Sequence, residues 1–480
     1  MKRLRCAGCL AASVVAVTLA ASGCRSRLAY KQSDIDQHVM LRGLGPQFLL
    51  GVATSAYQTE GGNHNDWTAW EAGHYPDGRP HVAGGATAAR AADSWNRWRD
   101  DVRALEQLGA NVYRLGVEWS RLEPREGAWD ADAAAHYREI LLALRAATPH
   151  PIEPMLNLYH FTLPDWVVAR GGWEWSGAPA AFAAFAGRVA DAFGDVVDQW
   201  CTLNEPNVYV TKGFLSADWP PGVHDPKRAG RVLVQLLLAH GLAAAALRQH
   251  DRADADGDGA AARIGLAHNV IVFDPVSSGP LDTVVARIAD RFYNLTVPEA
   301  LASGRIRVAL PMQVDLDEPA PLLKGSLDWL GVNYYTRHVV RSHLSRETPY
   351  EIVVDPQRPH NDMGWEIYPE GLERMLEKLA PYGWPLLVSE NGIADRAGTV
   401  RPDFIRAHVY ALDRAREKGV NVIGYMHWSL MDNFEWSHGY QGRFGLYAID
   451  FDGDPTLARR PTPAVATFQQ LARNIGLLPR

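Results

Sequence analysis

Two glutamates, Glu205 and Glu390, stand in short polar signatures that each follow an apolar stretch of the chain. The signatures read Thr-Leu-Asn-Glu-Pro at positions 202–206 and Leu-Val-Ser-Glu-Asn-Gly at positions 387–392. A solvated strand end would explain either glutamate alone. Two glutamates at the ends of buried strands are nevertheless the pair that hydrolysis of a glycosidic bond needs, because one carboxyl donates a proton and the other acts as nucleophile or base.

The chain of 480 residues is long enough for two ordinary domains or for one large barrel. Its formal net charge of -7 offers no basic footprint for phosphate groups, which argues against a nucleic-acid partner. The 16 tryptophans are more informative, because indole rings stack on the apolar C–H faces of sugars. Most of them must still be core residues, so their number supports a carbohydrate ligand without locating its site.

Residues 1–23 are predicted to be a signal peptide of the lipoprotein type. A basic head within the first five residues precedes an apolar stretch at 10–21, which is too short to span a membrane as a stable helix. The Ala-Ser-Gly-Cys that follows resembles the cleavage signal of bacterial lipoproteins, in which the cysteine becomes the lipid-bearing first residue. We therefore expect lipidation at Cys24. Export without an anchor and a chance cysteine are the alternatives.

Cysteine usage is consistent with export. Two cysteines leave with the signal, Cys24 would carry the lipid, and only Cys201 remains, so no internal disulfide is possible. Residues 24–45 are polar and have no clear period, and we interpret them as a tether between the membrane and a domain at 46–480. The expected location is the bacterial cell envelope, at the outer membrane or in the periplasm where the cell has two membranes.

Past residue 45, short apolar runs alternate with longer amphipathic stretches almost to the C-terminus. Eight runs have the length of strands: 48–54, 112–119, 152–159, 199–203, 264–269, 327–335, 385–389 and 422–429. Helix-compatible stretches with apolar residues three and four apart lie between them, among them 94–108, 179–193, 232–249, 371–379 and 402–418. Eight parallel strands with helical crossovers predict an α/β fold, a single (β/α)8 TIM barrel.

A doubly wound sheet would show the same alternation, so the polar residues at the strand ends decide between the two folds. In a TIM barrel the catalytic groups come from the C-terminal ends of several strands. Distinctive side chains lie in or just after seven of the eight runs: Gln58, Arg114, His160, Asn204 with Glu205, Asn333 with Tyr335, Glu390 and Trp428. Each has an ordinary structural explanation alone, whereas their convergence on one face indicates a barrel with one site.

These residues belong to longer motifs that resemble glycoside hydrolase family 1, the family of retaining β-glucosidases and β-galactosidases. The first motifs are the opening signature at 48–61, Tyr-Arg-Leu at 113–115 and Asn-Glu-Pro at 204–206. The later motifs are Asn-Tyr-Tyr at 333–335, Ser-Glu-Asn-Gly at 389–392 and Trp-Ser-Leu-Met-Asp-Asn-Phe-Glu-Trp at 428–436. The resemblance runs from about residue 46 to about residue 473, which leaves no room for a second catalytic domain.

The resemblance implies roles for four catalytic residues. Glu205 matches the acid/base of the family and Glu390 matches its nucleophile, a pair that hydrolyses with retention of configuration through a glycosyl-enzyme. Arg114 is expected beside Glu390, where its charge favours the ionised nucleophile. Tyr335 is expected to donate a hydrogen bond to the same carboxylate.

The resemblance also implies a set of substrate-binding residues. The residues expected to hold the non-reducing sugar are Gln58, His160, Asn204, Asn333, Glu435 and Trp436, with Trp428 as an apolar floor. Trp365 matches the platform on which the family binds the aglycone, the group that leaves.

Two motif positions bear on the substrate. Glu435 followed by Trp436 favours an unphosphorylated glycoside, because the phospho-glycosidase branch of the family replaces this pair and a carboxylate there repels phosphate. Asn207 stands where many bacterial members carry Trp, and it resembles an archaeal-type branch that acts on glucosides, galactosides and fucosides. The predicted activity is hydrolysis of terminal β-D-glucosyl residues, with β-galactosyl and β-fucosyl residues as further substrates.

Two functions of other classes keep many of the same residues. A transglycosidase would use both glutamates but pass the sugar to an acceptor hydroxyl. A non-catalytic glycan-binding lipoprotein would keep the barrel, although relatives that took this path typically lose one glutamate. Apart from a small β-glycoside and the membrane anchor, no partner is expected, and no surface pattern predicts the oligomeric state.

No metal or cofactor is expected. The acidic stretch Asp-Ala-Asp-Gly-Asp-Gly at 254–259 resembles the start of a calcium loop, but its twelfth position is Gly265, where a bidentate glutamate is needed. We interpret it as a solvated acidic turn.

Overall fold

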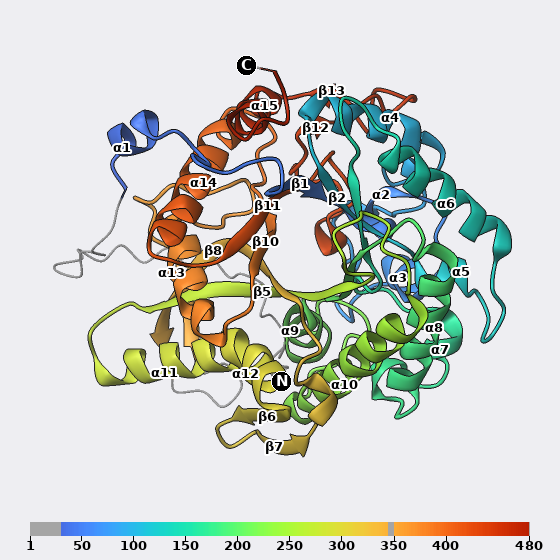
Figure 1. Cartoon of the computed structure of the whole chain (residues 1–480). Coiled ribbons are helices and arrows are strands. Elements are labelled where there is room, and N and C mark those ends of the chain that lie inside the picture. Colours follow the sequence, from blue (N-terminus) through green and yellow to red (C-terminus); the bar gives the residue numbers. More distant parts are fainter. Residues whose placement is uncertain (1–29, 344–349, 480) are drawn as a thin grey trace.

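Eight parallel strands form a closed barrel in the computed structural model, which describes residues 30–343 and 350–479. They pair in the order β1, β2, β3, β4, β5, β8, β10 and β11, and the pairing of β11 with β1 completes the circle (Figure 1). Their bounds are β1 Leu49–Ala53, β2 Val112–Gly116, β3 Glu153–Asn157, β4 Gln199–Asn204, β5 Arg263–Pro275, β8 Trp329–Ser342, β10 Leu386–Asn391 and β11 Val422–Trp428. The predicted TIM barrel is confirmed.

Helices connect the strands and surround the barrel (Figure 1). The longer ones are α4 Ser94–Leu108, α6 Ala131–Arg145, α8 Ala178–Phe193, α10 Pro226–His250, α11 Pro280–Asp290, α12 Thr296–Ser303, α13 Glu370–Leu379, α14 Arg401–Glu417 and α15 Ala464–Asn474. The shorter ones are α1 Gln32–Gln37, α2 Ala56–Thr59, α3 Asp66–Glu71, α5 Trp119–Leu122, α7 Asp165–Val168 and α9 Pro206–Val210. Small hairpins and bridges add β6 Arg305–Leu310, β7 Val314–Pro319, β9 Tyr350–Val353, β12 Tyr447–Ala448 and β13 Arg460–Pro461.

The five predicted helical stretches coincide with α4, α8, α10, α13 and α14. The start of α10 differs most from its prediction, because the helix begins at Pro226 rather than at residue 232. The side chain of Asp225 accepts hydrogen bonds from the backbone N–H groups of Lys227 and Arg228, which is a standard helix start. An Asp-Pro pair ahead of the apolar period was the signal for this first turn.

The helix α10 is the only one in the described part of the chain that is long and apolar enough to cross a membrane, with a mean hydropathy of 1.6 in its most apolar window. Most of that window is buried inside the protein. Its buried face includes Leu233, Leu236 and Leu237. We therefore interpret α10 as a core helix of the barrel, not as a membrane span.

The interior of the barrel is filled by side chains. One buried residue from each of seven strands contributes to a common cluster: Val112, Met155, Cys201, Ala267, Trp329, Leu387 and Met426, with Leu49 of the eighth strand packed against them. Such a layer supports the strand ends above it, as in other closed barrels. Cys201 within this layer is a buried free thiol.

Two strands extend well beyond their predicted ends. The prediction stopped β5 at residue 269 and β8 at residue 335, whereas the structure continues them to Pro275 and Ser342. After an irregularity in register between Val270 and Val272, the two extensions pair with each other, and β9 adds to β8 in antiparallel orientation. The extension is thus stabilised by pairing between distant segments, which local periodicity does not report.

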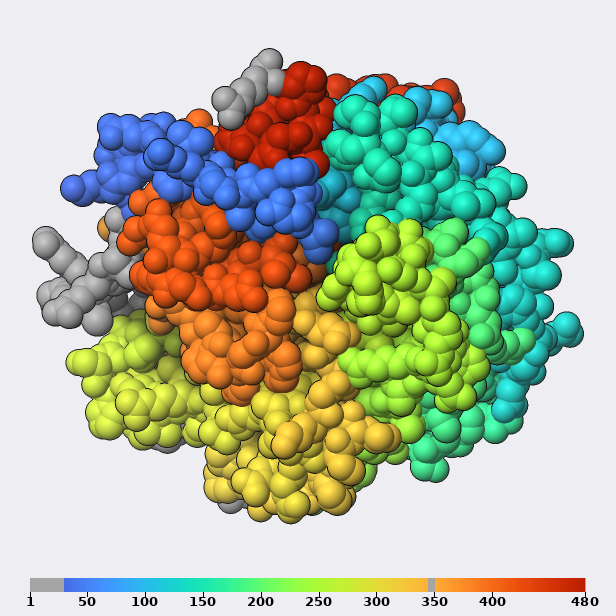
Figure 2. All heavy atoms as spheres, viewed as in Figure 1, coloured from blue at the N-terminus to red at the C-terminus, as the bar shows by residue number. Residues whose placement is uncertain are grey.

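The segment predicted as a tether is docked on the barrel from Tyr30 onward, which corrects the prediction for residues 30–45; residues 24–29 lie outside the described part of the chain. It forms α1 and buries Ile35 and Leu41. The side chain of Asp413 in α14 accepts a hydrogen bond from the backbone N–H of Leu41 at 2.6 Å and lies 2.9 Å from Nε2 of His38. Figure 2 shows this blue N-terminal segment lying against the orange segment that contains α14. The few buried apolar residues are separated by polar ones, so the sequence showed no period.

The predicted signal peptide and Cys24 lie outside the described residues. Their assignment stays a prediction.

Candidate active site

Glu390 lies at the C-terminal end of β10, with 3% of its surface exposed. The buried guanidinium of Arg114 on β2 donates to its Oε1 at 2.5 Å, and the hydroxyl of Tyr335 on β8 donates to its Oε2 at 2.6 Å. Burial raises the pKa of Glu390, while Arg114 and Tyr335 oppose this rise. Each oxygen of this carboxyl therefore faces a donor that stabilises the ionised form.

Glu205 directly follows β4, and its backbone has a left-handed φ of 46°. Such a backbone costs energy in a residue other than glycine and is often retained where a side chain must be aimed. The side chain is buried, and Oε1 accepts N–H groups from Asn269 and Asn333, each at 2.8 Å. Burial and, after it, the negative charge of Glu390 raise the pKa of Glu205 to about 8.

The two carboxyls therefore differ in their protonation. Glu205 stays protonated at neutral pH, since nothing cationic contacts it directly among the described residues and its pKa is about 8. Glu390 contacts a guanidinium and a phenol that both favour its anion. A protonated acid beside a carboxylate that is held ready to ionise is the pair that acid-assisted displacement requires.

Gln58 and Glu435 form a polar edge beside these carboxyls. Nε2 of Gln58 donates to the backbone oxygen of Phe434 at 2.9 Å and lies 3.4 Å from Oε2 of Glu435. Loss of hydration and then the charges of Glu390 and Glu205 raise the pKa of Glu435 to about 8. This carboxyl can therefore both donate to and accept from neutral hydroxyl groups near pH 7.

His160 connects the aromatic and polar parts of the site. Its ring lies nearly parallel to the indoles of Trp428 and Trp436, with ring centroids 5.7 and 6.0 Å away. Burial and then the charge of Arg114 lower the pKa of His160 well below its usual range, so the ring is neutral. Its Nε2 lies 3.2 Å from the amide nitrogen of Asn204, whose carbonyl oxygen accepts a hydrogen bond from Arg114 at 2.6 Å.

Trp365 joins the site through the ring of Tyr335. The two ring centroids are 5.9 Å apart in an edge-on arrangement, and Trp365 also lies 6.1 Å from Phe444. These residues belong to one apolar cluster together with Trp428. The residues predicted as floor and as aglycone platform are therefore parts of one aromatic surface.

The structure brings the predicted catalytic and substrate-binding residues together at one end of the barrel. Hydrogen bonds and ring contacts join ten of them into one network: Arg114, Asn204, Glu205, Asn333, Tyr335, Glu390, His160, Trp428, Trp436 and Trp365. Gln58 and Glu435 contact each other beside this network, and the charges of Glu390 and Glu205 act on Glu435. Their separate roles in binding and catalysis stay predictions at this point.

Three residues of the network were not predicted. Asn269 donates to Glu205 from the fifth strand, Tyr293 donates to the Oδ1 of Asn269 at 2.8 Å, and Ser389 donates to the Oδ1 of Asn333 at 2.7 Å. Asn269 was detectable, because it is the last residue of the predicted fifth run and every other run contributed a polar or aromatic side chain. Tyr293 follows that run by 24 residues and carries no sequence signal.

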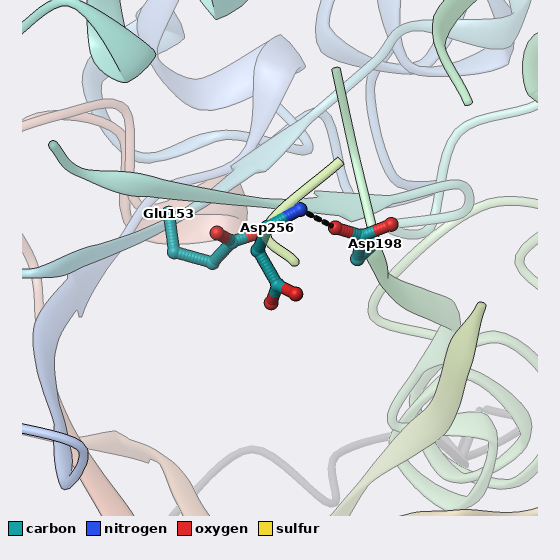
Figure 3. Close-up of side chains that lie close together, drawn as sticks. All are labelled: Glu153, Asp198 and Asp256. Atoms are coloured by element: carbon teal, nitrogen blue, oxygen red, sulfur yellow. Dashed lines mark hydrogen bonds between the residues drawn. The ribbon is translucent and has the colours of Figure 1, made fainter. Parts of the chain in front are cut away.

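An acidic group lies at the opposite, N-terminal edge of the neighbouring strands. The carboxyls of Glu153, Asp198 and Asp256 lie within 4.8 Å of one another, and the backbone N–H of Asp256 donates to Asp198 (Figure 3). These residues come from three segments of the chain, so their spacing in the sequence shows no metal-ligand motif. Arg145 donates to both oxygens of Glu153 and thereby neutralises part of the group. This acidic group takes no part in the site around Glu205.

Comparison with known proteins agrees with this geometry. A model of glycosyl hydrolase family 1 matches residues 42–477. A β-galactosidase from Pyrococcus woesei is 31% identical over 90% of this chain and 97% of its own length, and β-glucosidase A from Thermotoga maritima is 32% identical over 90% and 98%.

Solved structures show the same similarity. A β-glycosidase from Pyrococcus horikoshii has a TM-score of 0.80 and 34% identity, covering 91% of this chain and 96% of its own. A β-glucosidase from Thermotoga maritima in complex with glucoimidazole has a TM-score of 0.79 and 28% identity, covering 90% and 99%. With the two glutamates placed at the ends of β4 and β10 of such a barrel, the chain belongs to glycosyl hydrolase family 1 and is a glycoside hydrolase of the β-glucosidase type.

Proposed function

We propose that this protein is a retaining β-glycosidase that removes terminal non-reducing β-D-glucosyl residues, and also β-galactosyl and β-fucosyl residues. The observation that carries the proposal is the unequal environment of two neighbouring buried carboxyls. Arg114 and Tyr335 stabilise the anion of Glu390, whereas burial and the charge of Glu390 keep Glu205 protonated. A nucleophile and an acid of this kind are the two groups of a double displacement.

The reaction then proceeds in two steps. In the first, Glu390 attacks the anomeric carbon, the bond to the leaving oxygen breaks, and that oxygen takes the proton of Glu205. In the second, the Glu205 carboxylate removes a proton from water, and the water oxygen displaces Glu390 from the anomeric carbon. Two inversions give net retention. Tyr335 can donate to Glu390 in the free enzyme and release it when the covalent bond forms.

The polar edge of Gln58 and Glu435, together with His160 and Asn204, holds the hydroxyl groups of the sugar. A neutral sugar fits this edge best. Glu390 raises the pKa of Glu205, and both raise the pKa of Glu435, so a phosphate group would add negative charge to a site that already disfavours it. The names of the relatives, β-galactosidase and β-glucosidase, support a site that accepts more than one neutral sugar.

We also propose export and anchoring to the bacterial cell envelope through a lipid on Cys24. The basic head, the apolar stretch and the Ala-Ser-Gly-Cys box support this location.

The first test is a panel of p-nitrophenyl glycosides: β-glucoside, β-galactoside, β-fucoside, β-mannoside and 6-phospho-β-glucoside. Wild type should turn over the neutral glucoside, galactoside and fucoside but not the phosphorylated substrate. Glu390→Ala should lose at least about 10⁴-fold in kcat, because the nucleophile is gone. Proton NMR of the first sugar released should show the β-anomer.

The alternatives give different results in the same panel. Release of the α-anomer would contradict the retaining mechanism. A transglycosidase would release p-nitrophenol with little free sugar, and added acceptor would increase the transfer product. A glycan-binding protein would be inactive on every substrate while remaining folded by circular dichroism.

A further inference from the structure

Two amide groups donate to the same oxygen of Glu205. Nδ2 of Asn269 on β5 and Nδ2 of Asn333 on β8 each lie 2.8 Å from Oε1. A carboxyl oxygen has two lone pairs, so both sites on Oε1 are filled by N–H donors. No residue in the described part of the chain donates to Oε2. The proton of the neutral carboxyl is therefore directed to Oε2.

This arrangement depends on the orientation of both amides. A side-chain amide that rotated by half a turn would present its oxygen to Glu205 in place of its nitrogen. The hydroxyl of Tyr293 donates to Oδ1 of Asn269 at 2.8 Å, and the hydroxyl of Ser389 donates to Oδ1 of Asn333 at 2.7 Å. Burial and then the charge of Glu205 raise the pKa of Tyr293 well above its usual range, so its hydroxyl keeps its proton.

The side chain of Asn207 holds the backbone of Tyr293 in place. Tyr293 lies in the π-helical turn Arg291–Leu295, and Nδ2 of Asn207 donates to the backbone oxygens of both Asn269 and Tyr293, at 2.9 and 3.2 Å. Asn207 follows Glu205 by two residues, so the segment that carries the carboxyl also fixes the residues that orient it. The ring of Tyr293 packs edge-on against Phe273, with centroids 5.8 Å apart.

We propose that Tyr293 and Ser389 are positioning residues, which lock two amides onto Oε1 of Glu205 and so reserve Oε2 as the oxygen that gives and takes the catalytic proton. The inference rests on the acid/base role proposed above for Glu205. In the first step the Oε2 proton passes to the departing oxygen as the glycosidic bond breaks. In the second step a proton from water returns to Oε2 as the water oxygen attacks.

The charged and titratable groups that act on Glu205 or are affected by its charge are Glu390 of β10, Arg114 of β2, Tyr335 of β8, Glu435 after β11 and Tyr293. The hydrogen bonds from Asn269 and Asn333 lower the pKa of Glu205 against the larger effect of burial. Loss of either donor should therefore raise this pKa, and with it the pH at which the acid form is lost.

The test compares leaving groups in Tyr293→Phe and Ser389→Ala. In Tyr293→Phe the Asn269 amide is free to rotate and to present its oxygen to Oε1 of Glu205. The carboxyl then carries its proton on Oε1 and not on Oε2. We expect kcat/KM for a phenyl β-glycoside, whose leaving group needs the acid, to fall about tenfold. A 2,4-dinitrophenyl β-glycoside needs no proton donor and should stay within about twofold of wild type. The alkaline limb of the phenyl-substrate pH profile should move upward.

The matched control is Tyr350→Phe. The Tyr350 ring also packs against Phe273, with centroids 6.4 Å apart, but it has no bond to Asn269. This variant should behave as wild type. Unchanged phenyl-substrate rates and an unmoved alkaline limb in both Tyr293→Phe and Ser389→Ala would overturn the inference. Equal loss on both substrates would also overturn it, because a general disturbance of the site has no leaving-group dependence.

Glu205→Ala separates this inference from the function on which it rests. If Glu205→Ala loses activity on the phenyl substrate selectively while Tyr293→Phe does not, the positioning role is wrong and the acid/base role stands. If Glu205→Ala shows no dependence on the leaving group, the proposed function itself fails. Stoichiometric release of dinitrophenol from a 2-deoxy-2-fluoro substrate verifies that each variant retains a competent nucleophile and fold.

Discussion

At the residue scale, the raised pKa of Glu205 sets an upper pH limit for activity. The carboxyl donates a proton in the first step, so the active form is the protonated one, and it is lost as pH rises through about 8. For a phenyl β-glycoside we expect kcat/KM to fall about tenfold per pH unit above that value. Initial rates between pH 5 and 10, with stability measured at each pH, check this.

The control for this pH limit removes the group that titrates. In Glu205→Ala, with a 2,4-dinitrophenyl β-glycoside that needs no acid, the alkaline limb should disappear. Azide should accelerate this variant and give a β-glycosyl azide. The space left by the lost carboxyl lies on the face of the sugar ring opposite to Glu390, so azide attacks the glycosyl-enzyme from that face. An unchanged limb in Glu205→Ala would assign the titration to another group, and an α-azide would contradict the acid/base role.

At the element scale, the strands were predictable where the barrel alone determines them. The runs at 48–54, 199–203 and 422–429 match β1, β4 and β11 closely, because a strand buried on both faces is a short continuous apolar run. The extensions of β5 and β8 were not predictable, since they depend on pairing with each other and with β9 outside the barrel.

The site residues also divide into those that local motifs predict and those that depend on contacts between distant segments. Gln58, Arg114, Glu205 and Glu390 stand at or near strand ends within motifs, so their convergence could be predicted. Tyr293 lies in a π-helical turn 24 residues after Asn269, and only the folded loop brings its hydroxyl to that amide. A residue that acts through another side chain leaves no pattern in a single sequence.

The docked N-terminal segment yields a prediction at this scale. Asp413 is buried and binds both the backbone N–H of Leu41 and the ring of His38. Asp413→Ala should lower the unfolding free energy by about 2 kcal/mol, because a hydrogen bond to a charged group is lost and a buried N–H is left unpaired. Urea unfolding followed by tryptophan fluorescence measures this loss, and activity at 25 °C should be retained.

The matched control for the docked segment is Asp36→Ala. Asp36 of α1 is half-exposed and pairs with Arg406 of α14 at the surface. An exposed pair is worth about 0–1 kcal/mol, so this variant should unfold near the wild-type urea concentration. Equal unfolding midpoints for Asp413→Ala and wild type would mean that the segment does not contribute to the stability of the barrel.

At the scale of the whole molecule, docking of the N-terminal segment limits the distance between the barrel and its proposed anchor. Six residue steps separate Cys24 from Tyr30, the first described residue. A fully extended chain of this length spans at most about 20 Å. A lipid on Cys24 would therefore hold the face that carries α1, α13 and α14 close to the membrane surface.

The anchor itself is tested by Cys24→Ala in a bacterial host that processes lipoproteins. The wild-type enzyme should sediment with membranes and incorporate labelled palmitate, because cleavage leaves Cys24 as an acylated first residue. Cys24→Ala removes the residue at which the signal is cleaved and the lipid is attached, so this variant should lose the label. Cys6→Ala is the control, since that cysteine is removed with the signal and its loss should change neither the label nor the location. Palmitate incorporation that persists in Cys24→Ala, or a wild-type enzyme that is unlabelled and free of membranes, would contradict the anchor and favour simple export.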